Sequence, residues 1–203
     1  MLSPCDAVRA AEQSDVPALL AMMRELAGFE DYLDDFRVDE QALLSRAFGP
    51  DAQCEVLVAD GGGHLAGYAV VLAIPFTFDL RPTLLLKELY VREGHRRAGL
   101  GQALMQGVAL LAQRKGAGRL KWDVLRGNAR AQAFYARLGG KPDDKWVAYQ
   151  MDRQALDRLV ASPRWPTRTL LESGSPLSPR AASPAPAPGT ASSDVRRACW
   201  RLR

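Results

Sequence analysis

The chain has 203 residues, of which 47% are hydrophobic and 25% charged, a balance typical of one globular domain with a sizeable core. Its formal net charge of +4 comes from residues 161–203, where seven Arg outnumber one Glu and one Asp, so residues 1–160 carry −1. The folded part is therefore not basic, which argues against a domain that binds nucleic acid through its surface charge.

The cysteines and the hydropathy pattern exclude several other classes of protein. Cys5, Cys54 and Cys199 are far apart and form no CxxC motif, so neither a disulfide framework nor a zinc site is supported, and we expect no metal. The N-terminus lacks a basic start followed by an apolar stretch. The sequence also has no run of about eighteen apolar residues, the length that a membrane-spanning helix needs. We therefore expect a cytoplasmic enzyme or binding protein that does not contact membranes.

The N-terminal part predicts a short strand over residues 7–11 and an amphipathic helix that begins near the SDVP segment and runs to about residue 28. The acidic segment FEDYLDDFRVDEQ follows. It is either a solvated loop or one wall of a cleft that attracts a cationic substrate. A second short helix is expected over residues 41–48, with a stop at Gly49-Pro50.

Three strands are predicted next. Residues 55–59 and 65–74 are separated by a glycine-rich turn and read as an antiparallel hairpin. Residues 83–91 are too apolar for a strand with one face in water, so they predict a central strand that is covered on both sides.

The stretch over residues 84–104 reads LLLKELYVREGHRRAGLGQAL, a strand, a loop of Arg and Gly, and the start of an apolar-periodic helix. Arg96, Gly99 and Gly101 fit the pattern R-x-x-G-x-G. Such a loop can offer several backbone N–H groups to one anion, while the helix dipole adds partial positive charge. We interpret it as a site for the pyrophosphate of an acyl-CoA.

Other glycine-rich loops fit less well. A dinucleotide loop has the order G-x-G-x-x-G near the start of its domain, and a Walker loop needs G-K-[ST], whereas this loop is in the middle of the chain and has neither pattern. The plainest alternative is that the glycines only permit a tight turn.

Past the loop, the helix ends at Gly116 and Gly118, and a strand over residues 119–125 implies a parallel crossover. Asn128 is expected to cap a further helix that stops at Gly139. The segment KWVAYQM at 145–151 predicts a strand that closes the sheet, and residues 154–160 a last turn or two of helix. We divide the chain into a domain over residues 1–160 and a Pro/Ala/Ser-rich basic tail over 161–203, which we expect to be disordered.

Two residues are candidates for the proton transfers that a thioester acyl transfer to an amine requires. Tyr135, seven residues after Asn128 and on the same side of its helix, could protonate the departing thiolate. Glu88 interrupts an apolar strand and could take a proton from the attacking ammonium, directly or through a water. Alternatively, Glu88 is a paired structural charge and Tyr135 a core aromatic residue. The cysteines lie outside the motifs, so a covalent enzyme intermediate has no obvious nucleophile.

Taken together, ELYVREGHRRAGLGQAL and VLRGNARAQAFYARLGGKP resemble the two signature segments of the GNAT superfamily of N-acetyltransferases, and the resemblance covers residues 7–158. It implies an α/β fold with a mixed, mostly antiparallel central sheet, helices on both faces, and acetyl-CoA as co-substrate. The backbone of Leu89, Tyr90 and Val91 would pair with the pantetheine arm, and Asn128 and Tyr135 would lie near the thioester. The pyrophosphate would be held by Arg96, Arg97, Ala98, Gly99, Leu100, Gly101 and Gln102.

Within that superfamily, RELAGFEDYLDD, IPFTFDLRPTLLLKELYV and KWVAYQMDRQAL resemble the diamine branch, which includes the spermidine/spermine and thialysine acetyltransferases. The resemblance implies a homodimer, with Glu30 and Glu88 near the acceptor amine. Lys87 stands where that branch usually has an acidic residue, and its positive charge disfavours a polycation and favours a small monoamine or an amino-acid-like acceptor.

The sequence thus predicts an enzyme that acetylates a primary amine of a small molecule by direct attack on acetyl-CoA. An alternative from another class is a non-catalytic acyl-CoA sensor, for which Lys87 is the hint. A third hypothesis, a nucleic-acid-binding role for the basic tail, is weakened because the tail lacks interleaved aromatic residues and a fold.

Overall fold

The computed structural model describes residues 7–162, and these fall into two compact units divided between Lys141 and Pro142. The disordered tail predicted from sequence lies outside the described residues from position 163 onward. Cys5 and Cys199 also lie outside them.

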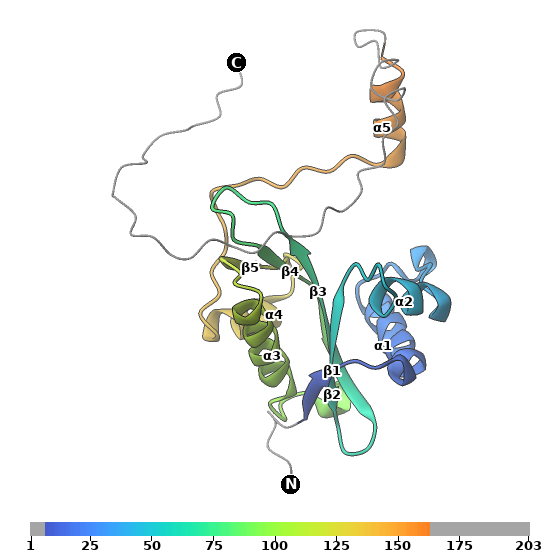
Figure 1. Cartoon of the computed structure of the whole chain (residues 1–203), viewed down its shortest axis with the longest axis vertical. Coiled ribbons are helices and arrows are strands. Elements are labelled where there is room, and N and C mark those ends of the chain that lie inside the picture. The colour runs from blue at the N-terminus through green and yellow to red at the C-terminus, as the bar shows by residue number, and fades with distance from the viewer. Residues whose placement is uncertain (1–6, 163–203) are drawn as a thin grey trace, which may run out of the picture. The chain divides into compact units, whose positions relative to one another are not determined.

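The first unit is built on a five-stranded sheet whose strands are neighbours in chain order (Figure 1). Pairing is antiparallel from β1 to β4 and parallel between β4 and β5, which confirms the predicted mixed, mostly antiparallel sheet. The strands are β1 (Val8–Ala10), β2 (Glu55–Asp60), β3 (Leu65–Ile74), β4 (Thr83–Val91) and β5 (Arg119–Lys121).

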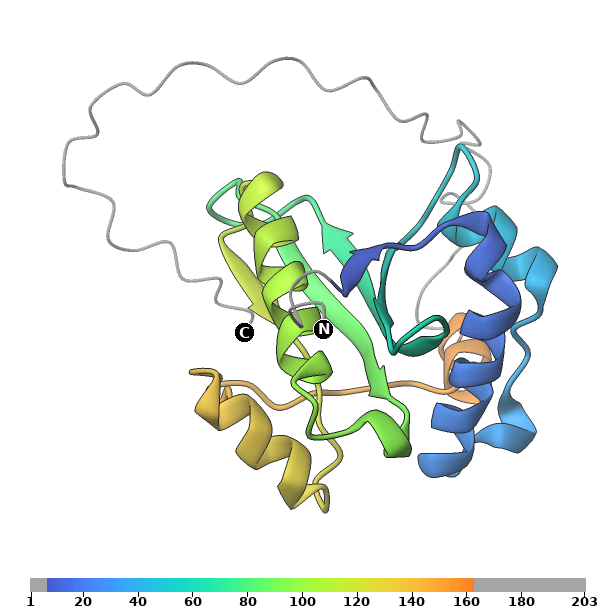
Figure 2. The same cartoon turned by 90° about the horizontal axis from the view of Figure 1, so that it is seen from below.

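Helices cover both faces of this sheet, as predicted (Figure 2). On one face, α1 and α2 enclose a core that includes Leu19, Met22 and Tyr68, while on the other α3 packs through Leu104 and Val108. Short 3-10 helices lie at Gln13–Asp15, Leu33–Asp35 and Glu93–His95. The helices of this unit are α1 (Val16–Phe29), α2 (Glu40–Ala47), α3 (Leu100–Arg114) and α4 (Ala129–Arg137).

The helix starts follow from local polar contacts. The Asp15 carboxylate accepts from the Glu12 N–H at 2.8 Å and from Arg9 at 2.7 Å, which fixes the chain just before α1. These contacts, Arg9 first, lower the pKa of Asp15. Asp39 accepts from the Ala42 N–H at 2.7 Å and so caps α2.

A β-bulge interrupts the pairing of β3 with β4. Val70 is opposite Glu88, but the next residue, Val71, is opposite Leu86, so Lys87 is an extra residue without a partner. The bulge reverses the alternation of side chains along β4. Leu84 and Leu86 therefore belong to the core on the α3 face, whereas Glu88 lies opposite Val70, whose side chain is in the core on the α1 face.

Two predicted strands differ from the structure. β5 ends at Lys121 rather than at residue 125, and residues 145–151 form no strand. Trp146 and Tyr149 are 67% and 94% exposed. A strand needs a ladder partner as well as an apolar pattern, and within residues 7–162 the outer edge of β5 has none.

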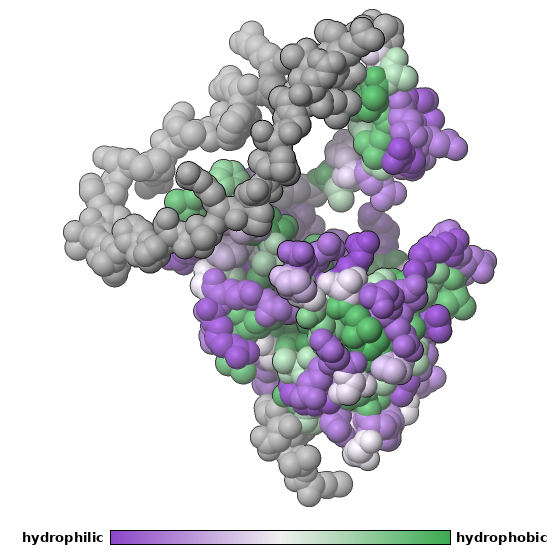
Figure 3. All heavy atoms as spheres, turned by 45° about the vertical axis from the view of Figure 1, so that its right-hand side comes forward, coloured by the Kyte–Doolittle hydropathy of each residue, from purple (hydrophilic) through white to green (hydrophobic). Residues whose placement is uncertain are grey.

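The second unit contains one described helix, α5 (Arg153–Val160). Asp152 caps it by accepting from the Ala155 N–H at 2.7 Å. Figure 3 shows hydrophobic residues on one side of this helix and hydrophilic residues on the other. In the part of the chain that the structure describes, no helix has the length and apolar character needed to cross a membrane.

Candidate active site

A cavity of about 870 Å³ opens in the first unit, beside β4 and the loop that follows it. Its wall combines the C-terminal end of α1, the bulged half of β4, the glycine loop, and α4 with the segment before it. Most residues predicted for the site line it, namely Glu30, Glu88, Leu89, Tyr90, Val91, Arg96, Arg97, Gly99, Gly101, Gln102, Asn128 and Tyr135.

Ala98 and Leu100 are not among the lining residues. Leu100 is 7% exposed, and its side chain belongs to the core on the α3 face. The prediction that these two residues contact the pyrophosphate is therefore limited to their backbone N–H groups.

The bulge brings the adjacent residues Lys87 and Glu88 to the wall of one cavity. Glu88 is half-buried, and its Oε2 accepts a hydrogen bond of 2.7 Å from the Tyr68 hydroxyl on β3. Burial and then the Glu88 carboxylate raise the pKa of Tyr68, so this hydroxyl keeps its proton and acts as the donor. Among residues 7–162, no group bonds to Oε1 of Glu88, so the carboxylate has a structural partner and also a free oxygen.

Sequence reasoning missed Tyr68. The signal was its place as the one aromatic residue in the strand LAGYAVVLAI. Its role could not be predicted, because it depends on the register that brings Tyr68 and Glu88 to the same face of the sheet.

The acidic segment contributes one charge to the cavity wall. Glu30 follows directly after α1, and desolvation together with the Glu88 carboxylate raises its pKa, while Lys87 acts in the opposite direction. Glu30, Lys87 and Glu88 thus form one group of interacting charges. The two carboxylates also act on Tyr32. Its pKa is raised first by desolvation and then by the charges of Glu88 and Glu30.

The glycine loop has the backbone geometry of an anion site. Gly99 has a φ of +84° and immediately precedes α3, whose first N–H groups have no partner within the helix. Arg97 also adopts a positive φ, of 70°. The Arg96 Nε donates to the Val91 carbonyl at 2.9 Å, which folds the loop back onto the end of β4.

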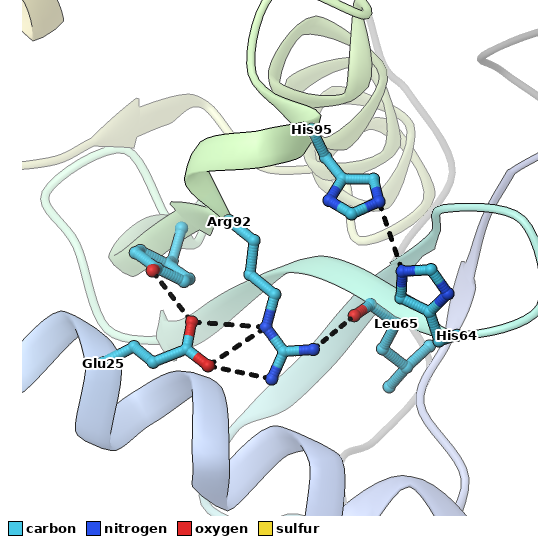
Figure 4. A network of polar contacts seen from close by, with 6 residues as sticks. Glu25, His64, Leu65, Arg92 and His95 are labelled. Carbon is cyan, nitrogen blue, oxygen red and sulfur yellow. Dashed lines mark hydrogen bonds and ion pairs between the residues drawn. The ribbon is translucent and has the colours of Figure 1, made fainter.

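Polar contacts on two sides hold this loop against the rest of the unit (Figure 4). Arg92 forms an ion pair of 2.9 Å with Glu25 on α1, and Glu25 also accepts from the Tyr90 hydroxyl at 3.0 Å. On the other side, the Nε2 atoms of His95 and His64 lie 3.2 Å apart, joining the loop to the turn between β2 and β3.

Tyr135 is positioned by packing. The centroid of its ring lies 5.1 Å from the ring centroid of Trp122 and 5.1 Å from that of Phe134. Its backbone carbonyl accepts from the Gly140 N–H at 2.9 Å. A Cβ on Gly140 would lie 2.6 Å from the Trp122 ring, so a larger residue where the chain leaves α4 would displace this ring, which packs on Tyr135. Desolvation and then Glu30 raise the pKa of Tyr135 to about 12, so the hydroxyl is protonated at neutral pH.

Asn128 has a structural contact of its own. Its side chain accepts from the Ala131 N–H at 3.0 Å and so caps α4, as the sequence predicted, while the residue also lines the cavity. A role for this side chain beside a thioester stays a prediction.

Comparison with known proteins agrees with this geometry. Residues 22–140 match the model of the Acetyltransferase (GNAT) family. The thialysine N-epsilon-acetyltransferase of Sus scrofa is 30% identical over an alignment covering 75% of this chain and 96% of the relative. The L-ornithine N5-acetyltransferase NATA1 of Arabidopsis thaliana is 28% identical, over 55% of this chain and 46% of the relative.

Solved structures share the fold. An integron cassette protein from the mobile metagenome of V. cholerae superposes with a TM-score of 0.65 at 22% identity, over 76% of this chain and 97% of that one. A soil-metagenome aminoglycoside acetyltransferase, solved with sisomicin, gives a TM-score of 0.61 at 15% identity, over 71% of this chain and 94% of that one. From the family match, the relatives and the fold we conclude that the chain belongs to the GNAT family of acetyltransferases.

Proposed function

We propose that this protein transfers an acetyl group from acetyl-CoA to a primary amine of a small molecule by direct attack. The observation that carries the proposal is the composition of one cavity, which is lined by the glycine loop, the Glu88 carboxylate and the Tyr135 hydroxyl. An anion site and two groups able to move protons are the parts that such a transfer needs.

The residues present fit acetyl-CoA, which supplies the activated acyl group as a thioester. The loop at Gly99 offers backbone N–H groups and a helix N-terminus to the pyrophosphate, with Arg96 and Arg97 beside it. The edge of β4 at Leu89, Tyr90 and Val91, beyond the residues that pair with β5, would pair with the pantetheine arm. The volume of about 870 Å³ is within the range of small-molecule sites.

Glu88 and Tyr135 take different roles because their surroundings differ. Glu88 has a free carboxylate oxygen toward which an ammonium group can direct a proton, directly or through a water. Tyr135 holds its proton at neutral pH and can deliver it to the departing thiolate sulfur. Both are catalytic residues in this proposal, and Glu30 binds the protonated form of the acceptor.

The names of similar proteins refer to amines of several kinds, namely thialysine, ornithine and aminoglycosides. For this chain we propose a diamine, a polyamine or an amino-acid-like amine as the acceptor. A homodimer remains a prediction based on the resemblance to the diamine branch.

Consumption of acetyl-CoA, measured over a panel of diamines, polyamines, lysine analogues and aminoglycosides, tests the function. We expect turnover with at least one class and formation of an N-acetylated product by mass spectrometry. Tight binding of CoA in calorimetry without turnover of any acceptor would contradict the proposal and favour the alternative, a non-catalytic acyl-CoA sensor.

The charge of Glu30 predicts a pH dependence of acceptor binding. Because the pKa of Glu30 is raised, the carboxylate loses its charge at a higher pH than an ordinary glutamate as the solution is acidified. The KM for the amine should therefore rise as the pH falls through this pKa, and should be low and constant above it.

The test compares the KM for the amine in the wild type and in Glu30→Gln, from about pH 4.5 to about pH 7.5, at saturating acetyl-CoA. The variant should have a higher KM at neutral pH and a flatter pH profile. Profiles of the same shape in the two proteins would show that Glu30 does not bind the acceptor.

A further inference from the structure

We propose that Lys87 is a specificity-determining residue, which binds the carboxylate of an amino-acid-like acceptor while Glu30 and Glu88 receive its side-chain amine. This inference rests on the proposed function and refines it. It assigns the acceptor to the class of ω-amino acids that carry an α-carboxylate, in preference to diamines and polyamines.

The bulge in β4 brings Lys87 to the same cavity as Glu88. In a regular strand, neighbouring residues point to opposite faces of the sheet, so a cationic residue next to Glu88 would point away from it. Here Lys87 is the unpaired residue between the pairs Val71–Leu86 and Val70–Glu88. The extra residue places both Lys87 and Glu88 in the wall of the same cavity.

The ammonium group of Lys87 is available at the cavity wall. Lys87 is exposed, and between residues 7 and 162 no carboxylate forms an ion pair with it. Lys115, by contrast, is paired with Glu55 at 2.5 Å. A cation that is left unpaired at a cavity wall is available to an anionic group of a ligand.

Lys87 shares its part of the cavity wall with the carboxylates of Glu30 and Glu88. Lys87 acts on the pKa of Glu30 in the direction opposite to Glu88, so the three charges share one field. The part of the cavity wall formed by Glu30, Lys87 and Glu88 combines two carboxylates with one ammonium, and it is complementary to a molecule with an ammonium group at one end and a carboxylate at the other. A diamine or polyamine would bring a second cation toward Lys87, which like-charge repulsion disfavours.

Lysine and cadaverine test this inference, because they have the same amine and carbon chain and differ by the α-carboxylate. We expect the wild type to have the higher kcat/KM for lysine. In Lys87→Glu the ratio of the kcat/KM values, lysine over cadaverine, should fall by about tenfold or more, mainly through KM, and in Lys87→Gln it should fall less. Lys87→Arg should keep most of the preference.

Lys141→Glu is the matched control, because it makes the same change of charge at an exposed lysine that does not line the cavity. Calorimetric titration of lysine and cadaverine into the complex with CoA provides a readout that does not depend on turnover. The Kd values for the two amines should change in the same direction as their KM values.

The outcomes separate this inference from the function on which it rests. If the wild type acetylates neither compound and no other amine, the proposed function fails and the inference fails with it. If amines are acetylated but the ratio is the same in wild type and Lys87→Glu, only the role of Lys87 is overturned. An equal loss of kcat for both acceptors would also overturn it, because Lys87 would then act on the chemistry.

Discussion

Tyr135→Phe is expected to lower kcat by about 10²-fold to 10⁴-fold, the usual contribution of a positioned acid, with little change in the affinity for acetyl-CoA. The substitution removes only the hydroxyl, and within residues 7–162 that hydroxyl has no hydrogen-bond partner to lose. The ring contacts with Trp122 and Phe134 remain. The fold should therefore be unaffected, while the departing thiolate loses its proton donor.

Steady-state kcat and the Kd for acetyl-CoA by calorimetry measure the two expectations separately. Tyr149→Phe, the same exchange at a residue that is 94% exposed, is the control and should behave as the wild type. Because the pKa of Tyr135 is raised to about 12, its ionisation should not reduce the wild-type kcat below about pH 11. A kcat that is unchanged in Tyr135→Phe would exclude the hydroxyl as the acid.

Gly99→Asp is expected to abolish detectable binding of acetyl-CoA. The positive φ of Gly99 costs about 1 kcal/mol or more for a residue with a Cβ, although Asp tolerates it better than most. The larger effect is electrostatic, because the carboxylate would occupy the N-terminus of α3 that we assign to the pyrophosphate. Repulsion between these anions acts where the positive end of the dipole otherwise favours binding.

Gly116→Asp is a matched control for this variant. Gly116 follows the other end of α3, has a positive φ of 63°, and no atom lies within 4 Å of the position of an added Cβ. The Gly116→Asp variant carries the same substitution in a left-handed conformation but away from the cavity, so this protein should bind acetyl-CoA normally. Melting curves of both variants establish that they are folded, and a folded Gly99→Asp protein with wild-type affinity would contradict our assignment of the loop.

Much of the fold could be predicted from the sequence because its elements carry strong local signals. The 3.6-residue pattern of α1 and α3, the Pro at the start of α1 and the glycines at the ends of α3 and α4 each depend on nearby residues. The apolar run of β4 predicted its bounds and its place inside the sheet, between β3 and β5, although the middle strand of the five described is β3. The glycine loop was found in the same way, since both its strand and its helix are adjacent in the chain.

The features that escaped prediction depend on partners that are distant in sequence. The bulge at Lys87 exists only in the pairing of β3 with β4, and a two-residue alternation continued from Leu84 would place Glu88 on the wrong face. The contact of Tyr68 with Glu88 follows from that register. For residues 145–151, the apolar pattern was correct for a strand, but a pattern does not supply the neighbouring strand.

The ion pair between Arg92 and Glu25 joins residues that are 67 positions apart in the sequence. Arg92 follows directly after β4 and Glu25 lies on α1, so the two walls of the cavity cannot meet through local folding alone. Closing such a long loop costs entropy before the contacts that it brings together can offset that cost. The cavity is therefore complete only when the N-terminal helix is docked on a sheet that contains β4.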